Sequence, residues 1–271
     1  MFDGSNLIYR YDGSFDGLLC CVFESFLKKE IPADILPPDA LQATLFPAKD
    51  IETEPEKARR VLVSIPKKIS GEALDLVRHA FLTCAPHKER DILLFLRLGF
   101  RFGPQVLDML TNDAVDALQK AVRRLHNEAH QYKGFLRFSD INGALAAQIE
   151  PKNMVLPLLM QHFCERYPEE HFLIYDRTHG SALIYRPHKP VILPVDDFQM
   201  PAPDETERSY RELWRLFYKT IEIEGRHNPR CRMSHIPKRY WAEMTEFADS
   251  STQPSSIQVK LPKKEDNYYL N

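Results

Sequence analysis

Residues 171–186 carry the strongest local folding signal in the chain, the sequence HFLIYDRTHGSALIYR. Two strand-like runs, Phe172–Asp176 and Ala182–Arg186, flank the turn sequence RTHGS, in which Gly180 can adopt a positive φ. Strands joined by so short a turn pair antiparallel. The chain must therefore contain a sheet that includes this hairpin, and KPVILPV at 189–195 could add another strand.

Apolar residues at helical spacing occur on both sides of this hairpin. They predict one helix each at 15–28, 154–166 and 205–224, and several successive helices over 70–131. In the first of these we expect Phe15, Leu19, Phe23 and Phe26 to be buried against the sheet of the middle strands. The predicted fold class is α+β, with a mixed or antiparallel sheet that contains a hairpin and is packed by helices, plus a mainly helical segment.

The remaining segments are less regular. NLIYRYDG predicts a short strand that ends in a glycine turn. The Pro-rich stretch 31–46 predicts irregular structure that could include a short strand at its end. Residues 53–70 predict a charged segment followed by a strand-like run, Val61–Ile65. FLRFSD and GALAAQIE, at 135–140 and 143–150, are spaced like the two strands of a hairpin.

These segments favour one domain followed by a tail. We predict a single α+β domain over residues 1–249, with a helical insertion at about 70–131. Pro237 would start a last helix of this domain, PKRYWAEMTEF. Residues 250–271 are polar and are predicted to be a loosely attached C-terminal tail.

Charge and cysteine content narrow the function classes. The formal net charge is −2, so a site for a polyanion would have to be a local basic patch. No run of about 18 apolar residues predicts a membrane span, and the first residues do not predict a secretory signal. The five cysteines form no paired motif, which predicts reduced thiols, a cytoplasmic location, no metal ligands and no cofactor.

The sequence GRHNPRCRMSHIPKRYW at 225–241 supplies such a basic patch, because it contains five Lys or Arg residues and no acid. Guanidinium groups bind phosphates, and aromatic rings can stack on bases. The candidate nucleic-acid or phosphate-binding residues are Arg226, Asn228, Arg230, Arg232, Lys238, Arg239, Tyr240 and Trp241. A structural alternative is that the two aromatic residues lie in the core and that the arginines pair with Glu222, Glu224, Glu243 and Glu246.

Two further clusters could form part of a pocket. Tyr11, Asp12, Ser14 and Asp16 surround two glycines at a predicted strand-to-helix turn, where Ser14 or Asp16 could equally serve as a helix N-cap. The cluster contains neither of the two common glycine-rich nucleotide-binding motifs.

The second cluster contains histidines. Asp176 and His179 in the hairpin turn could form a carboxylate–histidine pair or an Asx turn, and His235 lies within the basic segment. His126 and His130 have the i, i+4 spacing of half a zinc site, but no third ligand is apparent in the sequence.

Three segments of the sequence together resemble a bacterial family of DNA metabolism or DNA repair proteins. They are YDGSFDGLLCCVFESF, FLIYDRTHGSALIY and RHNPRCRMSHIPKRYWAEMTEF. In that family, a domain of unknown function occurs alone, beside a radical S-adenosylmethionine protein, or fused ahead of a uracil-DNA-glycosylase-like domain. This chain is similar to the stand-alone form, since it lacks a CxxxCxxC cluster motif and space for a glycosylase domain. The resemblance supplies context and implies no catalytic residues.

The resulting expectation is a DNA repair or modification accessory protein that binds nucleic acid, with DNA as the first candidate, through residues 225–241. The resemblance alone implies a radical S-adenosylmethionine protein as a partner. One alternative is an enzyme that acts on nucleic acid or a nucleotide, with acidic residues near the basic segment. A further alternative is a protein–protein adaptor whose acidic partner binds the same segment.

Overall fold

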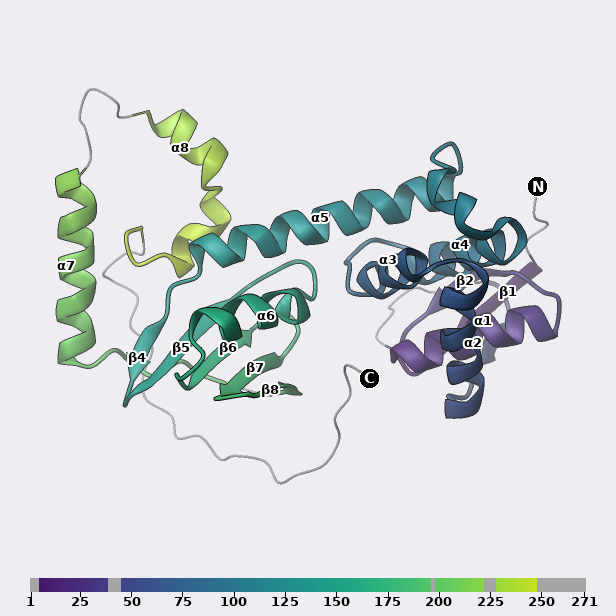
Figure 1. The fold of residues 1–271 in the computed structure, drawn as a ribbon, viewed down its shortest axis with the longest axis horizontal. Helices are drawn as coiled ribbons and strands as arrows, with labels where there is room; N and C mark the ends of the chain where they lie inside the picture. Colours follow the sequence, from purple (N-terminus) through teal and green to yellow (C-terminus); the bar gives the residue numbers. More distant parts are fainter. Residues whose placement is uncertain (1–4, 39–44, 196–197, 222–227, 248–271) are drawn as a thin grey trace. The chain divides into compact units, whose positions relative to one another are not determined.

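A computed structural model describes residues 5–38, 45–195, 198–221 and 228–247 (Figure 1). Arg226 and residues 250–271, the predicted tail, lie outside the described residues. The chain divides into two compact units, residues 1–125 and 126–271, and each is described by itself below. The prediction of a single domain over 1–249 stays a prediction.

The first unit contains a small parallel sheet with strand order β2-β1-β3. Its strands are β1 (Ser5–Arg10), β2 (Pro32–Leu36) and β3 (Ala48–Asp50), and both neighbouring pairs are parallel. Helix α1 (Phe15–Leu27) connects β1 to β2, as a parallel crossover requires. The prediction of irregular structure at the start of 31–46 was therefore wrong, because the Pro-rich composition concealed strand β2 with its buried Ile35.

Helices form the rest of this unit, as expected for the mainly helical segment. They are α2 (Pro55–Lys68), α3 (Gly71–Phe81), α4 (Lys88–Phe102), the 3₁₀ helix η1 (Gly103–Asp108) and α5 (Asp113–Phe135), which continues into the second unit. The hydroxyl of Ser70 caps α3 by accepting a hydrogen bond from the Ala73 backbone N–H at 3.1 Å. The strand predicted at Val61–Ile65 was wrong, because the buried residues of this segment recur at helical spacing in α2.

The core of the first unit differs from the predicted helix face of α1. Leu19 is fully buried, as expected, but Phe15 and Phe23 are only half-buried and Phe26 is 40% exposed. The central residues of α1, Leu18 to Val22, are all buried, because the helix packs on α2, on α4 and beside the sheet. The middle strands, against which this helix was expected to pack, belong to the second unit.

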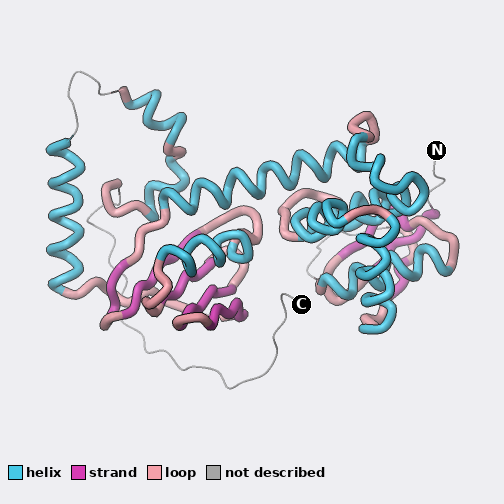
Figure 2. Tube along the Cα trace, viewed as in Figure 1, coloured by secondary structure: helices cyan, strands magenta, loops and turns pink. Residues whose placement is uncertain are grey.

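The second unit is built on a mixed five-stranded sheet with the order β4-β5-β6-β7-β8 (Figure 2). The strands are β4 (Ser139–Ile141), β5 (Ala144–Ile149), β6 (Phe172–Asp176), β7 (Ser181–Arg186) and β8 (Lys189–Pro194). Strands β5 and β6 are parallel and are connected through α6 (Leu156–Arg166), while the other pairs are antiparallel. The predicted hairpin is confirmed as β6 and β7, with Gly180 at φ 57°.

In the described part of the chain, the helical elements that follow the sheet are α7 (Glu205–Ile221), α8 (Pro229–His235) and the 3₁₀ helix η3 (Lys238–Glu243). The helix expected to start at Pro237 is thus a single short 3₁₀ segment. With one parallel sheet, one mixed sheet and packed helices, the α+β prediction is confirmed. No helix among the described residues has the length and apolar character needed to cross a membrane.

Candidate functional site

The basic segment folds into two short helical elements that fix its side chains. The side chain of Asn228 caps α8 by accepting a hydrogen bond from the Cys231 backbone N–H at 3.0 Å. Pro229 occupies the first turn of α8, and Pro237 precedes η3. Asn228 therefore has a structural role in the fold, whatever else it contacts.

The four described cations of this segment occupy different surroundings. Arg230, Lys238 and Arg239 are exposed, whereas Arg232 is half-buried. The Arg232 guanidinium lies 5.5 Å from the centre of the Trp241 ring and 5.4 Å from that of Phe247. The Arg239 guanidinium lies over the Tyr240 ring at 4.6 Å. Lys238 Nζ also lies 5.8 Å from the centre of the Trp241 ring. Three of the four cations are thus held against aromatic rings, while Arg230, Lys238 and Arg239 remain exposed to solvent.

The two adjacent aromatic residues are placed differently. Tyr240 is buried and packs edge-on against Tyr132 at a centroid distance of 5.0 Å, so it offers no free face to a base. Trp241 is half-buried and stacks on Phe247 at 4.8 Å, and its indole N–H donates to the Ile236 carbonyl at 3.0 Å. The core alternative therefore describes Tyr240 well, while Trp241 retains partial exposure.

Arg239 lies beside a buried acid that is not among the pairings considered for it. Its Nη1 is 3.5 Å from Oε1 of Glu128, a residue of α5 that is 4% exposed. Glu246 pairs with Arg137 at 2.7 Å, and Glu222 and Glu224 lie outside the described residues. Glu128 was missed as a site residue, because the sequence shows only a glutamate between two helical histidines.

Glu243 is the acid whose ionisation is changed most in this region. Its pKa is raised to about 7, mainly by burial. The nearby charges of Glu150 and Asp176 add to the rise, while the Glu150 backbone N–H and Arg239 oppose it. The hydrogen bond from the Glu150 N–H to Oε1 of Glu243 is 2.8 Å long. Glu150 directly follows β5 and Asp176 ends β6, so η3 lies at the carboxyl ends of the two parallel strands.

The turn after β6 contains both the Asx turn and the carboxylate–histidine pair that the sequence allowed. Asp176 is 1% exposed, and its Oδ1 accepts hydrogen bonds from the backbone N–H groups of Thr178 and His179, which is an Asx turn. Its other oxygen, Oδ2, lies 2.6 Å from Nδ1 of His179. A buried carboxylate thus orients an imidazole that remains 23% exposed.

The remaining predicted site residues have local structural partners. Ser14 caps α1, accepting from the Gly17 N–H at 2.9 Å, and Asp12 accepts from the Ser14 hydroxyl at 2.7 Å and from Thr53 at 2.8 Å. Burial raises the pKa of Asp12, but these hydrogen bonds outweigh it and hold the pKa below its ordinary value. Tyr11 is buried and donates to Glu89 at 3.3 Å. These residues form a helix cap in the first unit, and Asp16 in the same turn is exposed.

His235 belongs to α8 rather than to the Asp176 turn. Its Nδ1 lies 2.9 Å from the Cys231 carbonyl oxygen and 3.2 Å from the Ser234 hydroxyl. Among the described residues, no group of three His, Cys, Asp or Glu side chains is arranged to hold a metal ion. The convergent polar groups of the second unit are therefore Arg239, Glu128, Glu243, Glu150 and the Asp176–His179 pair.

The raised pKa of Glu243 predicts a pH-dependent stability. The folded protein favours the protonated carboxyl, so this contribution is fully present below the ordinary pKa of 4.5 and is lost as pH rises through about 7. Glu243→Gln cannot ionise, so at pH above this window it should be more stable than the parent chain by about 2 kcal/mol, at about 1.4 kcal/mol per pKa unit with allowance for partial solvent exposure.

Urea denaturation at several pH values measures this difference. Below the ordinary pKa, the two chains should have nearly equal free energies of unfolding. The exposed Glu165 gives a matched control, because Glu165→Gln should leave the pH profile of the parent unchanged. Parallel profiles for the parent and Glu243→Gln would contradict the raised pKa.

Comparison with known proteins gives one match. The model of a family described as a domain of unknown function, DUF4130, matches residues 86–246. This range includes α4, α5, the whole mixed sheet and the basic segment. No curated protein and no solved structure matches the chain.

Proposed function

Because the chain belongs to the DUF4130 family of domains of unknown function, we propose a function from its own residues: it binds nucleic acid through segment 225–241. In this proposal the protein is an accessory factor of DNA repair or modification, and DNA is the first candidate ligand. A radical S-adenosylmethionine protein is the proposed partner. The proposed binding rests on the charge of segment 225–241. The repair context and the partner rest on the resemblance of three sequence segments of the chain to the DNA repair family.

One observation carries the proposal. Arg230 and Lys238 are exposed, and neither forms an ion pair with any carboxylate in the described part of the chain. A surface arginine or lysine that is not neutralised by the protein is available to a phosphate. Arg239 contributes less to this surface, because Glu128 partly neutralises it.

A salt titration tests the proposal. Binding of single-stranded DNA through phosphate contacts should weaken as salt rises, with a log–log slope of about −0.7 for each contact. The double variant Arg230→Gln/Lys238→Gln should flatten this slope by about 1.4. The matched control is Arg186→Gln/Lys189→Gln, which removes one exposed arginine and one exposed lysine from β7 and β8.

The outcomes separate the remaining alternatives. Absence of binding to DNA and RNA at low salt would end the nucleic-acid proposal and favour an adaptor. An equal effect of the variant and its control would show a general charge effect instead of a site. The enzyme alternative is supported by the raised pKa of Glu243 beside Arg239 and Asp176. Chemical change in the recovered oligonucleotide, detected by mass spectrometry, would favour that alternative.

A further inference from the structure

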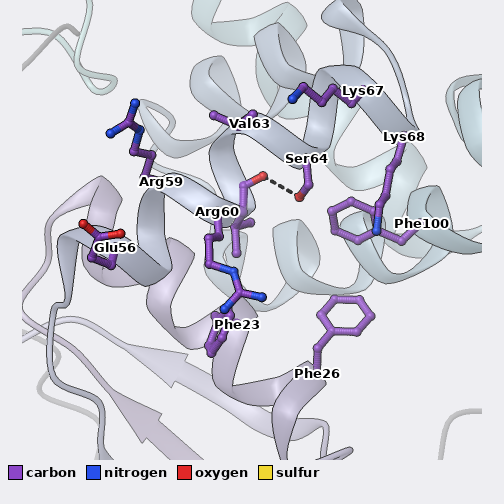
Figure 3. A pocket seen from close by; sticks show the side chains of 11 residues that line it. Phe23, Phe26, Glu56, Arg59, Arg60, Val63, Ser64, Lys67, Lys68 and Phe100 are labelled. Atoms are coloured by element: carbon purple, nitrogen blue, oxygen red, sulfur yellow. Dashed lines mark hydrogen bonds between the residues drawn. The ribbon is translucent and has the colours of Figure 1, made fainter.

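A groove in the first unit combines positive charge with aromatic rings. Its volume is about 760 Å³, and it lies between α1, α2 and α4 (Figure 3). Helix α2 contributes the cations Arg59, Arg60, Lys67 and Lys68. The aromatic residues of the lining are Phe23 and Phe26 from α1 and Phe100 from α4. None of these residues belongs to segment 225–241.

The charge of the groove is not neutralised within the described protein. All four cations are exposed, and none of them forms an ion pair with a described carboxylate. Their neighbour Lys57 differs, since it is paired with Glu24 at 3.0 Å and Glu54 at 2.6 Å. The lining contains a single acid, Glu56, so the groove is complementary to a ligand with several negative charges.

The rings of the groove are partly covered by cations and partly open. The Arg60 guanidinium lies over Phe23 at 5.2 Å, and Lys68 Nζ lies 5.9 Å from the centre of the Phe100 ring. Phe26 meets Phe100 edge-on at 5.5 Å and has the Arg97 guanidinium of α4 over its ring at 4.8 Å, yet it remains 40% exposed. An exposed phenyl ring and a planar guanidinium held on a second ring are both surfaces on which a nucleobase stacks.

The spacing of α2 aligns these groups. Arg59 and Arg60 precede Val63 by four and three residues, and Lys67 follows Val63 by four, so these side chains lie along one face of the helix. Val63 on this face is 42% exposed, and Figure 3 shows the cations at both ends of the row above the aromatic side chains. A row of cations beside an exposed ring has the pattern of a groove that follows a phosphate backbone and holds unpaired bases.

We propose that this groove binds single-stranded nucleic acid, with the α2 cations on the phosphates and with Phe26 against bases. A duplex fits this pattern poorly, because its base faces are stacked inside the helix. An acidic peptide would use the cations but would gain little from the ring faces. The inference is independent of segment 225–241 and gives the protein a second nucleic-acid surface in its other unit.

The charge part of the proposal is tested on the full chain with a fluorescent oligothymidine of about 12 nucleotides, within the usual site size of such grooves. Arg59→Gln/Arg60→Gln should flatten the log–log salt slope by about 1.4. Arg123→Gln/Arg124→Gln is the matched control, since it changes two adjacent exposed arginines of α5 and should leave the slope unchanged.

The stacking part needs a second pair of variants. Phe26→Leu keeps an apolar side chain but removes the ring, and it should weaken binding about 10-fold at every salt concentration without changing the slope. Phe102→Leu is the control, because Phe102 is 41% exposed on α4 and does not line the groove. A thermal melt of each variant confirms that the fold is intact.

Three results would overturn the inference: unchanged binding by both groove variants, equal affinity for duplex and single-stranded DNA, or displacement of the oligonucleotide by polyglutamate with no effect of Phe26→Leu. The variants test the groove and segment 225–241 separately. Loss of binding only in the groove variants would support the groove and reject the role of segment 225–241. Loss only in Arg230→Gln/Lys238→Gln would do the reverse.

Discussion

Phe95→Ala is expected to lower the free energy of unfolding of the first unit by about 3–5 kcal/mol. Phe95 is fully buried on α4, within the core cluster that α1, α2 and α3 also form. Truncation to alanine removes the transfer energy of the ring and leaves a cavity that the rigid helices can fill only in part. Chemical denaturation followed by far-UV circular dichroism measures the loss.

Phe26→Ala provides the contrast, because the same chemical change is made on a ring that is 40% exposed. Its cost should be below about 1 kcal/mol, as is usual for surface substitutions. If both variants were destabilised equally, α1 would be buried on the face that the sequence predicted, and the groove beside Phe26 would not exist. The pair therefore tests the fold of the first unit and the basis of the groove together.

The error over α1 has a physical origin. Helical spacing identifies a helix, but it shows which residues are buried only when one face is polar. In α1 the residues from Leu18 to Val22 are apolar or small and all are buried, so the sequence does not single out one stripe. Phe23 and Phe26, near the end of the helix, are left at the edge of the core, where Lys57 and Arg60 of α2 lie over Phe23 and Arg97 of α4 lies over Phe26.

Strand and helix signals competed in a similar way at 53–70. The β-branched residues of Val61–Ile65 favour a strand, but Pro55 at the first turn and buried residues at 58, 61 and 65 are typical of a helix. The hairpin of β6 and β7 was predictable, because short-range turn chemistry determines it. The parallel pairing of β5 with β6 depends on a crossover and was not evident from either strand alone.

The same distinction applies to the candidate site. The Asx turn and the Asp176–His179 pair are local, and the sequence allowed both. The contacts among Glu128, Asn153, Glu243 and Arg239 join residues far apart in the chain, and no sequence spacing reports them. The sequence could thus place the positive charge of segment 225–241 but could not show which cations remain free of acidic neighbours.

Glu128→Ala is expected to destabilise the second unit by about 3–5 kcal/mol, as the loss of a buried charged partner does. The Glu128 carboxylate accepts from the Lys152 backbone N–H at 3.1 Å, from the Asn153 backbone N–H at 2.9 Å and from Asn153 Nδ2 at 2.5 Å. It also faces Arg239 at 3.5 Å. Alanine would remove the acceptor of these hydrogen bonds from a site where both Glu128 and Asn153 are buried.

Glu165→Ala is the matched control, since Glu165 is exposed on α6 and its loss should cost no more than about 0.5 kcal/mol. Equal stability of the two variants in denaturant would show that Glu128 does not hold the loop after β5.

A second measurement follows from the same contacts. The loop begins at Glu150, whose backbone N–H donates to Glu243. Arg239 interacts with both acids, since it faces Glu128 and its charge lowers the pKa of Glu243. Releasing the loop should therefore change the pH dependence of stability that Glu243 produces, whereas Glu165→Ala should preserve it.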